Sequence, residues 1–147
     1  MESDIVKLLP HNEEAYQKLK KCLEENQLVA INHATGTGKS FIILKYLYEN
    51  KNKRILFLSP SYPINHQLVN EHTKELGIDI NEFVKIDTLI YSNLLKMNME
   101  VLANNYDIVI LDEYHRCGAK KWGIKVNQLL GIKMEEILGE QVAYIIY

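Results

Sequence analysis

The sequence has little of what marks a disulfide-bonded, zinc-binding or membrane-spanning protein. Only two cysteines occur in 147 residues, and Cys22 and Cys117 lie far apart in the chain. They form no C-x-x-C pair and the five histidines show no zinc spacing, so we expect reduced thiols in a cytoplasmic protein. No apolar run approaches the roughly 20 residues that span a bilayer, so no membrane partner is expected.

An excess of one charge is also lacking. The chain has 17 basic and 19 acidic residues and a net charge of −2, so no global basic signal for nucleic acid is present. The local basic clusters at 18–21, 51–54 and 120–121 are interpreted as solvated faces or turns. Hydrophobic residues make up 47% and charged residues 24%, which is ordinary for a globular chain, and the length suits one domain.

The most informative stretch that is present is glycine-rich and reads HATGTGKS from His33 to Ser40. An apolar run at 28–32 precedes it and a helical pattern at 41–48 follows it, which is the strand–loop–helix context of a phosphate-binding loop. The loop, with its glycines, and the helix N-terminus would direct backbone N–H groups at an anion. The residues expected to bind phosphate are Ala34, Thr35, Gly36, Thr37, Gly38, Lys39 and Ser40.

Two side chains of this loop have specific expected roles. Lys39 can reach the β- and γ-phosphates of a nucleotide, and the Ser40 hydroxyl can ligate Mg²⁺. His33 stands where the strict pattern has glycine. The alternative, a glycine-rich turn without a ligand, is disfavoured because a strand and a helix flank the loop as phosphate binding requires.

A second pattern supports the first. Residues 108–111 are four continuous apolar residues, typical of a strand buried on both faces of a parallel sheet. Asp112 and Glu113 follow at its carboxyl end, where open α/β sheets bind their ligands. An aspartate at this place can hold the Mg²⁺ of a nucleotide, and an adjacent glutamate can orient or deprotonate the attacking water.

The runs ATGTGKS and DEYHR resemble motifs I and II of superfamily 2 helicases, most closely the DEAD/DEAH-type group that includes the Res subunits of restriction enzymes. That group often carries a residue other than glycine where His33 stands. The resemblance covers residues from about 8 to 130. It implies an α/β fold, a three-layer RecA-like domain around a parallel sheet, with ATP and Mg²⁺ as cofactors. It also implies catalytic roles for Lys39, Asp112 and Glu113, and coupling of the site to motif III by His115.

Weaker resemblances lie between and before these motifs. Residues 58–61, with His66 and Gln67 after them, resemble motif Ia, a nucleic-acid-backbone contact. Residues 90–94 resemble the Thr-Tyr-x-x-Leu segment near motif Ib, with isoleucine in place of threonine. Residues 8–15 resemble an adenine-side Leu-Arg-Pro-Tyr-Gln-x-x-Ala signature, which implicates His11 and Asn12 in adenine contact. Leu9 and Asn12 replace its arginine and glutamine.

A complete helicase of this kind has two RecA-like domains with ATP between them. No Ser-Ala-Thr motif III follows DEYHR, and the final apolar run at 141–147 is predicted to be a strand. In RecA-like sheets the motif III strand lies between those of motifs I and II, so we expect this run in that slot. The chain is expected to be an incomplete domain, or one whose tail has diverged from about Gly131. Its implied partners are a second RecA-like domain and nucleic acid, DNA rather than RNA, and alone it should have little activity.

Two other function classes remain open. A different P-loop enzyme is one, although residues 50–53 fail the guanine-reading Asn-Lys-x-Asp pattern at the aspartate, and no Leu-Ser-Gly-Gly-Gln signature of an ABC ATPase is present. The other is a non-enzymatic remnant that binds nucleotide, or a partner through an exposed sheet edge.

Periodicity predicts repeated strand–helix units, which favour a parallel sheet. Helices are predicted at 12–26, 41–48, 64–76, 88–96 and 99–104 and in the tail, with Asn12 as an N-cap and Gly77 as a C-cap. Strands are predicted at 28–32, 54–58, 83–86, 108–111 and 141–147. Tyr62 and Tyr91 are expected to pack against the protein rather than stack on bases.

Overall fold

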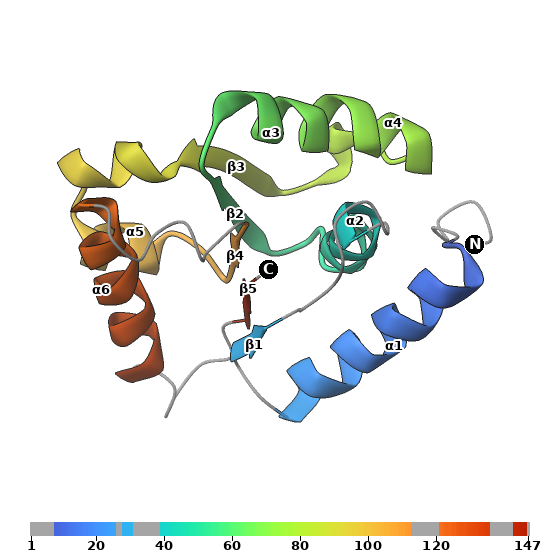
Figure 1. The fold of residues 1–147 in the computed structure, drawn as a ribbon, viewed down its shortest axis with the longest axis horizontal. Helices are drawn as coiled ribbons and strands as arrows, with labels where there is room; N and C mark the ends of the chain where they lie inside the picture. The colour runs from blue at the N-terminus through green and yellow to red at the C-terminus, as the bar shows by residue number, and fades with distance from the viewer. Residues whose placement is uncertain (1–7, 26–27, 31–38, 113–120, 136–142, 147) are drawn as a thin grey trace.

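The computed structural model describes residues 8–25, 28–30, 39–112, 121–135 and 143–146. A parallel sheet of five strands lies at the centre, in the order β1-β5-β4-β2-β3 (Figure 1). The strands are β1 (Leu28–Ala30), β2 (Arg54–Ser59), β3 (Lys85–Ile90), β4 (Ile108–Leu111) and β5 (Ala143–Ile146). The predicted parallel α/β sheet is therefore confirmed.

The last strand of the chain fills the gap between the first strand and the fourth. Tyr144 and Ile145 of β5 pair with Leu28 and Val29 of β1 on one side, and the same strand pairs with β4 on the other. This confirms the predicted position of the final strand, between the strand before the glycine-rich loop and the strand before Asp112. Because of this insertion, β1 reaches β4 only through β5.

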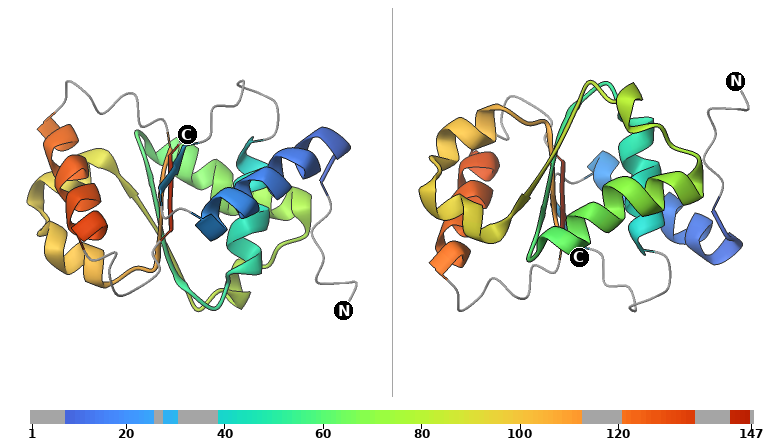
Figure 2. Two further views of the ribbon diagram at one scale, coloured as in Figure 1. Left: turned by 90° about the horizontal axis from the view of Figure 1, so that it is seen from below. Right: turned by 90° about the horizontal axis from the view of Figure 1, so that it is seen from above.

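Helices cover both faces of the sheet, which gives the three predicted layers (Figure 2). On one face lie α1 (Pro10–Glu25), α2 (Lys39–Glu49), α3 (Tyr62–His66) and α4 (Thr73–Leu76); on the other lie α5 (Met99–Asn104) and α6 (Lys121–Glu135). Each face buries its own apolar cluster. None of the described helices is both long enough and apolar enough to cross a membrane.

The side chains of the central strands alternate between these two clusters. Ile55 and Phe57 of β2 join the cluster under α1 and α2, whereas Leu56 and Leu58 join the cluster under α5 and α6. All four are fully buried. A strand covered on both faces needs apolar residues at every position, which explains why the sequence shows continuous apolar runs here instead of alternation.

The structure corrects the prediction of a helix from Thr88 to Lys96. Thr88, Leu89 and Ile90 complete β3, because they continue its register against β2, and a 3-10 helix follows at Tyr91–Lys96. The Asn93 side chain accepts a hydrogen bond from the Ile90 N–H at 2.9 Å, which turns the chain out of the strand.

The start of the first helix also differs from the prediction. Helix α1 begins at Pro10, and Glu13 N–H donates to the Leu9 carbonyl at 2.8 Å, so Asn12 lies inside the helix and is not its N-cap. Proline suits a first turn because the N–H that it lacks would have no partner there.

The helix predicted for 64–76 begins earlier, at Tyr62, with Pro63 in its first turn. Its middle, Gln67–His72, is π-helical. Gly77 ends it with a left-handed φ of 71°, which confirms the predicted C-cap.

Candidate functional site

The strand that precedes the predicted phosphate loop and the strand that precedes Asp112 end at one edge of the sheet. Ala30, the last residue of β1, and Leu111, the last of β4, both pair with Ile146 of the intervening β5. Their Cα atoms are therefore two strand spacings apart, about 10 Å. Because all three strands are parallel, the chain leaves β1 toward the glycine-rich run and leaves β4 toward Asp112 at this same carboxyl edge.

Asp112 is held firmly at this edge and is only 6% exposed. Its N–H donates to the Leu58 carbonyl at 2.9 Å, and its own carbonyl accepts from the Tyr91 hydroxyl at 2.7 Å. The hard oxygens of its carboxylate suit Mg²⁺.

Helix α2 begins at the end of the glycine-rich run. Lys39 is its first residue and Ser40, half-buried, its second. The helix is anchored below by Ile43, Leu44 and Leu47, each fully buried. Its N-terminus supplies unpaired N–H groups and the positive end of the helix dipole. The Ser40 hydroxyl and the Asp112 carboxylate are the oxygen donors that the sequence predicts for Mg²⁺, and this role stays a prediction.

Several predicted site residues lie outside the described residues. These are Ala34, Thr35, Gly36, Thr37 and Gly38 of the loop, together with Glu113 and His115. The backbone of Lys39 is helical, but its side chain lies outside the described part of the structure. The roles assigned to these side chains from the sequence stay predictions.

The two residues predicted near adenine differ in their environment. His11 is exposed, whereas Asn12 is only 2% exposed. The Oδ1 atom of Asn12 and the hydroxyl of Tyr16, one turn later, are both buried without a hydrogen-bond partner in the described part of the chain. A buried amide oxygen without a partner is costly, by about 1–3 kcal/mol, so Asn12 has unused capacity to accept a hydrogen bond.

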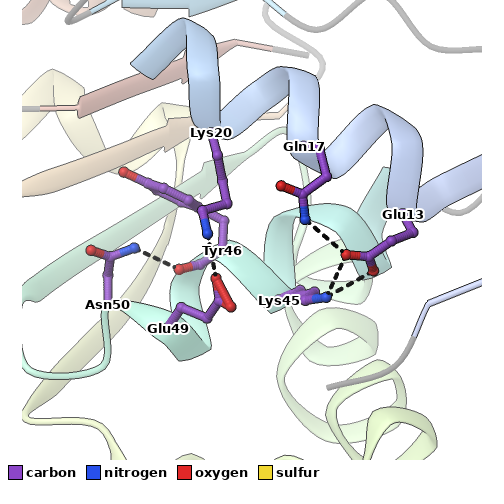
Figure 3. A network of polar contacts seen from close by, with 7 residues as sticks. All are labelled: Glu13, Gln17, Lys20, Lys45, Tyr46, Glu49 and Asn50. Atoms are coloured by element: carbon purple, nitrogen blue, oxygen red, sulfur yellow. Dashed lines mark hydrogen bonds and ion pairs between the residues drawn. The ribbon is translucent and has the colours of Figure 1, made fainter. Parts of the chain in front are cut away.

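The structure also shows a polar network that the sequence analysis missed, between α1 and α2 (Figure 3). Lys45 Nζ donates to both carboxylate oxygens of Glu13, at 2.9 and 2.8 Å, and lies 4.6 Å from the centre of the Tyr16 ring. Gln17 donates to Glu13 at 3.0 Å, and Lys20 lies 3.6 Å from Glu49. The sequence signal that could have indicated this network is Lys45, a charged residue in the middle of an otherwise apolar helical run.

This network gives a stability prediction. Replacing Glu13 by glutamine should lower the free energy of unfolding by about 2 kcal/mol, because it leaves the Lys45 ammonium, whose side chain is 8% exposed, without its counter-charge. The loss is smaller than for a fully buried pair because the Glu13 side chain is 36% exposed. Urea unfolding at neutral pH measures it. The neighbouring change Glu14→Gln breaks only the exposed Glu14–Lys18 pair and should cost less than about 0.5 kcal/mol. Equal losses in the two variants would contradict the assigned role of the pair.

The same pair sets a pH dependence. The hydrogen bond from Lys45 holds the pKa of Glu13 below its ordinary value of 4.5. The stabilisation from Glu13 is therefore complete above that value and is lost as the pH falls through the lower pKa of the folded state. Burial and the charge of Glu13 raise the pKa of Glu49, which has the opposite effect. The difference between wild type and Glu13→Gln should accordingly shrink in acid.

The segment that resembles motif Ia forms a second network at the carboxyl edge. Ser59 is fully buried; its Oγ donates to Asn65 Oδ1 at 2.6 Å and lies 3.0 Å from the Ser61 carbonyl. Asn65 Nδ2 then donates to the Leu89 carbonyl at 3.1 Å, so the segment that follows β2 is tied to the end of β3. Ser59 is therefore internal, and the exposed side chains in this motif begin at His66.

Comparison with curated proteins gives no match. The family model described as type III restriction enzyme, res subunit, matches residues 5–140, which is most of the chain. The match spans α1, the glycine-rich run, Asp112 and α6. The chain therefore belongs to the family of type III restriction enzyme Res subunits and is a superfamily 2 helicase-type ATP-binding domain.

Proposed function

We propose that this domain belongs to a nucleic-acid-dependent ATPase that couples ATP hydrolysis to strand movement. The observation that supports this most is that β1 and β4 end at the same carboxyl edge of the sheet. Only β5 lies between them, so the strand before the glycine-rich run and the strand before Asp112 end two strand spacings apart. Parallel α/β sheets bind ligands at this edge. The cytoplasm is the proposed place of action, since two cysteines far apart in the sequence are expected to be reduced thiols.

In this proposal the loop binds ATP from one side of the site and the acidic residues complete the other. Backbone amides of residues 35–40 contact the phosphates, Lys39 neutralises the β- and γ-phosphates, and Ser40 and Asp112 hold Mg²⁺. Bound Mg²⁺ supplies charge neutralisation of the transferred phosphoryl group. Glu113 orients the attacking water, and His115 couples the site to motif III.

The proposed nucleic-acid surface lies at the same edge, beside the ATP site. The hydrogen bonds of Asn65 fix the start of α3 to the ends of β2 and β3, and His66 and Gln67 are exposed directly after it. DNA is favoured over RNA because the family is named for restriction enzymes. With a net charge of −2, the domain cannot rely on overall charge, so binding must depend on local contacts. A second RecA-like domain is the proposed partner that closes on ATP and on the strand.

A charge placed on this surface tests the proposal. His66→Glu should weaken binding of a labelled single-stranded oligodeoxynucleotide about tenfold at low salt, because the new carboxylate repels the phosphates. Fluorescence anisotropy in the presence of Mg·ATP measures the affinity. Asn52→Glu adds the same charge at an exposed turn before β2, on the opposite edge of the sheet, and should change the affinity less than about twofold. Equal affinity in wild type and His66→Glu would place the strand elsewhere, and no binding by wild type would refute nucleic-acid coupling by this domain.

A further inference from the structure

We propose that Tyr91 is a positioning residue for the metal-binding carboxylate of Asp112, through a hydrogen bond to its backbone. The inference rests on the proposed function and adds a residue that acts without touching ATP or Mg²⁺. Tyr91 begins the 3-10 helix after β3, and its hydroxyl donates to the Asp112 carbonyl at 2.7 Å.

The contact reaches across the sheet. In the strand order, β2 separates β3 from β4, so the Tyr91 side chain extends from the end of the edge strand past the end of β2 to the end of β4. Leu58 is the last β2 residue in register with β4, opposite Leu111. The Tyr91 hydroxyl therefore provides a partner for the β4 chain at the place where this ladder stops.

The two hydrogen bonds at Asp112 act on both sides of its Cα atom. The N–H belongs to the peptide that joins Leu111 to Asp112 and is fixed by the Leu58 carbonyl at 2.9 Å. The carbonyl belongs to the next peptide and is fixed by Tyr91. Since each peptide is planar, fixing both restricts φ and ψ of Asp112 and thus the direction in which its side chain leaves the backbone. A metal ligand needs such control, because Mg²⁺ tolerates little departure from octahedral geometry.

The hydroxyl can be separated from the packing of the ring. Tyr91 is 1% exposed and packs in the cluster with Leu56, Leu58 and Leu94. A phenylalanine would fill the same space and lose only the hydrogen bond. Tyr106, which precedes β4, offers a matched control in the same cluster. It is 7% exposed, and its hydroxyl donates to Asp87 at 2.6 Å.

Calorimetric titration of ATP, once with Mg²⁺ and once with EDTA, tests the inference. We expect Mg²⁺ to strengthen ATP binding to wild type and Tyr91→Phe to reduce that gain about tenfold, as loss of a residue that orients a metal ligand does elsewhere. The affinity in EDTA should stay unchanged, and Tyr106→Phe should retain the full gain. A purely structural role would lower both affinities together, or would affect both tyrosine variants equally.

Three outcomes overturn the inference. The first is a full Mg²⁺ gain in Tyr91→Phe, which would leave the proposed function intact. The second is an equal loss in Tyr106→Phe, which would assign the effect to general packing. The third is a wild type that binds no ATP, which would refute the proposed function and this inference with it.

Discussion

Replacing Lys39 by alanine is expected to abolish Mg·ATP binding, with an affinity at least about 100-fold lower than wild type. The lysine stands at the junction of the glycine-rich run and α2, where its ammonium would meet the charge of the β- and γ-phosphates. Calorimetric titration of Mg·ATP into both proteins measures the loss.

The fold should survive this substitution. Helix α2 is held by Ile43, Leu44 and Leu47, which are fully buried in the apolar core. Alanine is also the residue that favours a helix most. The urea midpoint should therefore stay close to that of wild type. Lys21→Ala removes the same charge from an exposed position in α1 and should bind ATP normally. Equal ATP affinity in Lys39→Ala and wild type would refute the assignment of the loop.

Local patterns were sufficient to predict most of the fold. A continuous apolar run followed by charged residues predicts β4, and an apolar run before the glycine-rich stretch predicts β1. Both can be recognised because each signal lies within a few consecutive residues. The position of β5 came from the resemblance and is confirmed by its pairing with both neighbours. Gly77 was recognised as a helix end because few other residues adopt its positive φ.

The features that the sequence analysis missed depend on contacts between distant segments. Glu13 and Lys45 are 32 residues apart, and Tyr91 and Asp112 are 21 apart, so no local period links them. The same reason explains the error at Thr88–Ile90. Their conformation is decided by pairing with β2 across the chain, which overrides a local helical pattern.

The second large effect concerns turnover. Joining this chain to a second RecA-like domain should raise its rate of ATP hydrolysis by about 10³-fold or more, because an arginine finger supplied to P-loop enzymes is worth roughly 10³–10⁵ in rate. Closure of such a domain also excludes water and completes the site. By itself the chain should hydrolyse ATP very slowly.

Two variants define what the joined protein should show. Glu113→Gln should bind Mg·ATP but lose most of its turnover, because the amide cannot deprotonate the attacking water. Lys39→Ala should lose both binding and turnover. If Glu113→Gln kept full turnover, the water-orienting role would belong to another residue.

An assay of phosphate release tests the central claim most directly. It compares the chain alone with the chain joined to a second RecA-like domain, each with and without single-stranded DNA. The account predicts very slow release by the chain alone, faster release by the joined protein, and a further increase on addition of single-stranded DNA. Fast release by the 147-residue chain alone, unaffected by nucleic acid, would contradict it.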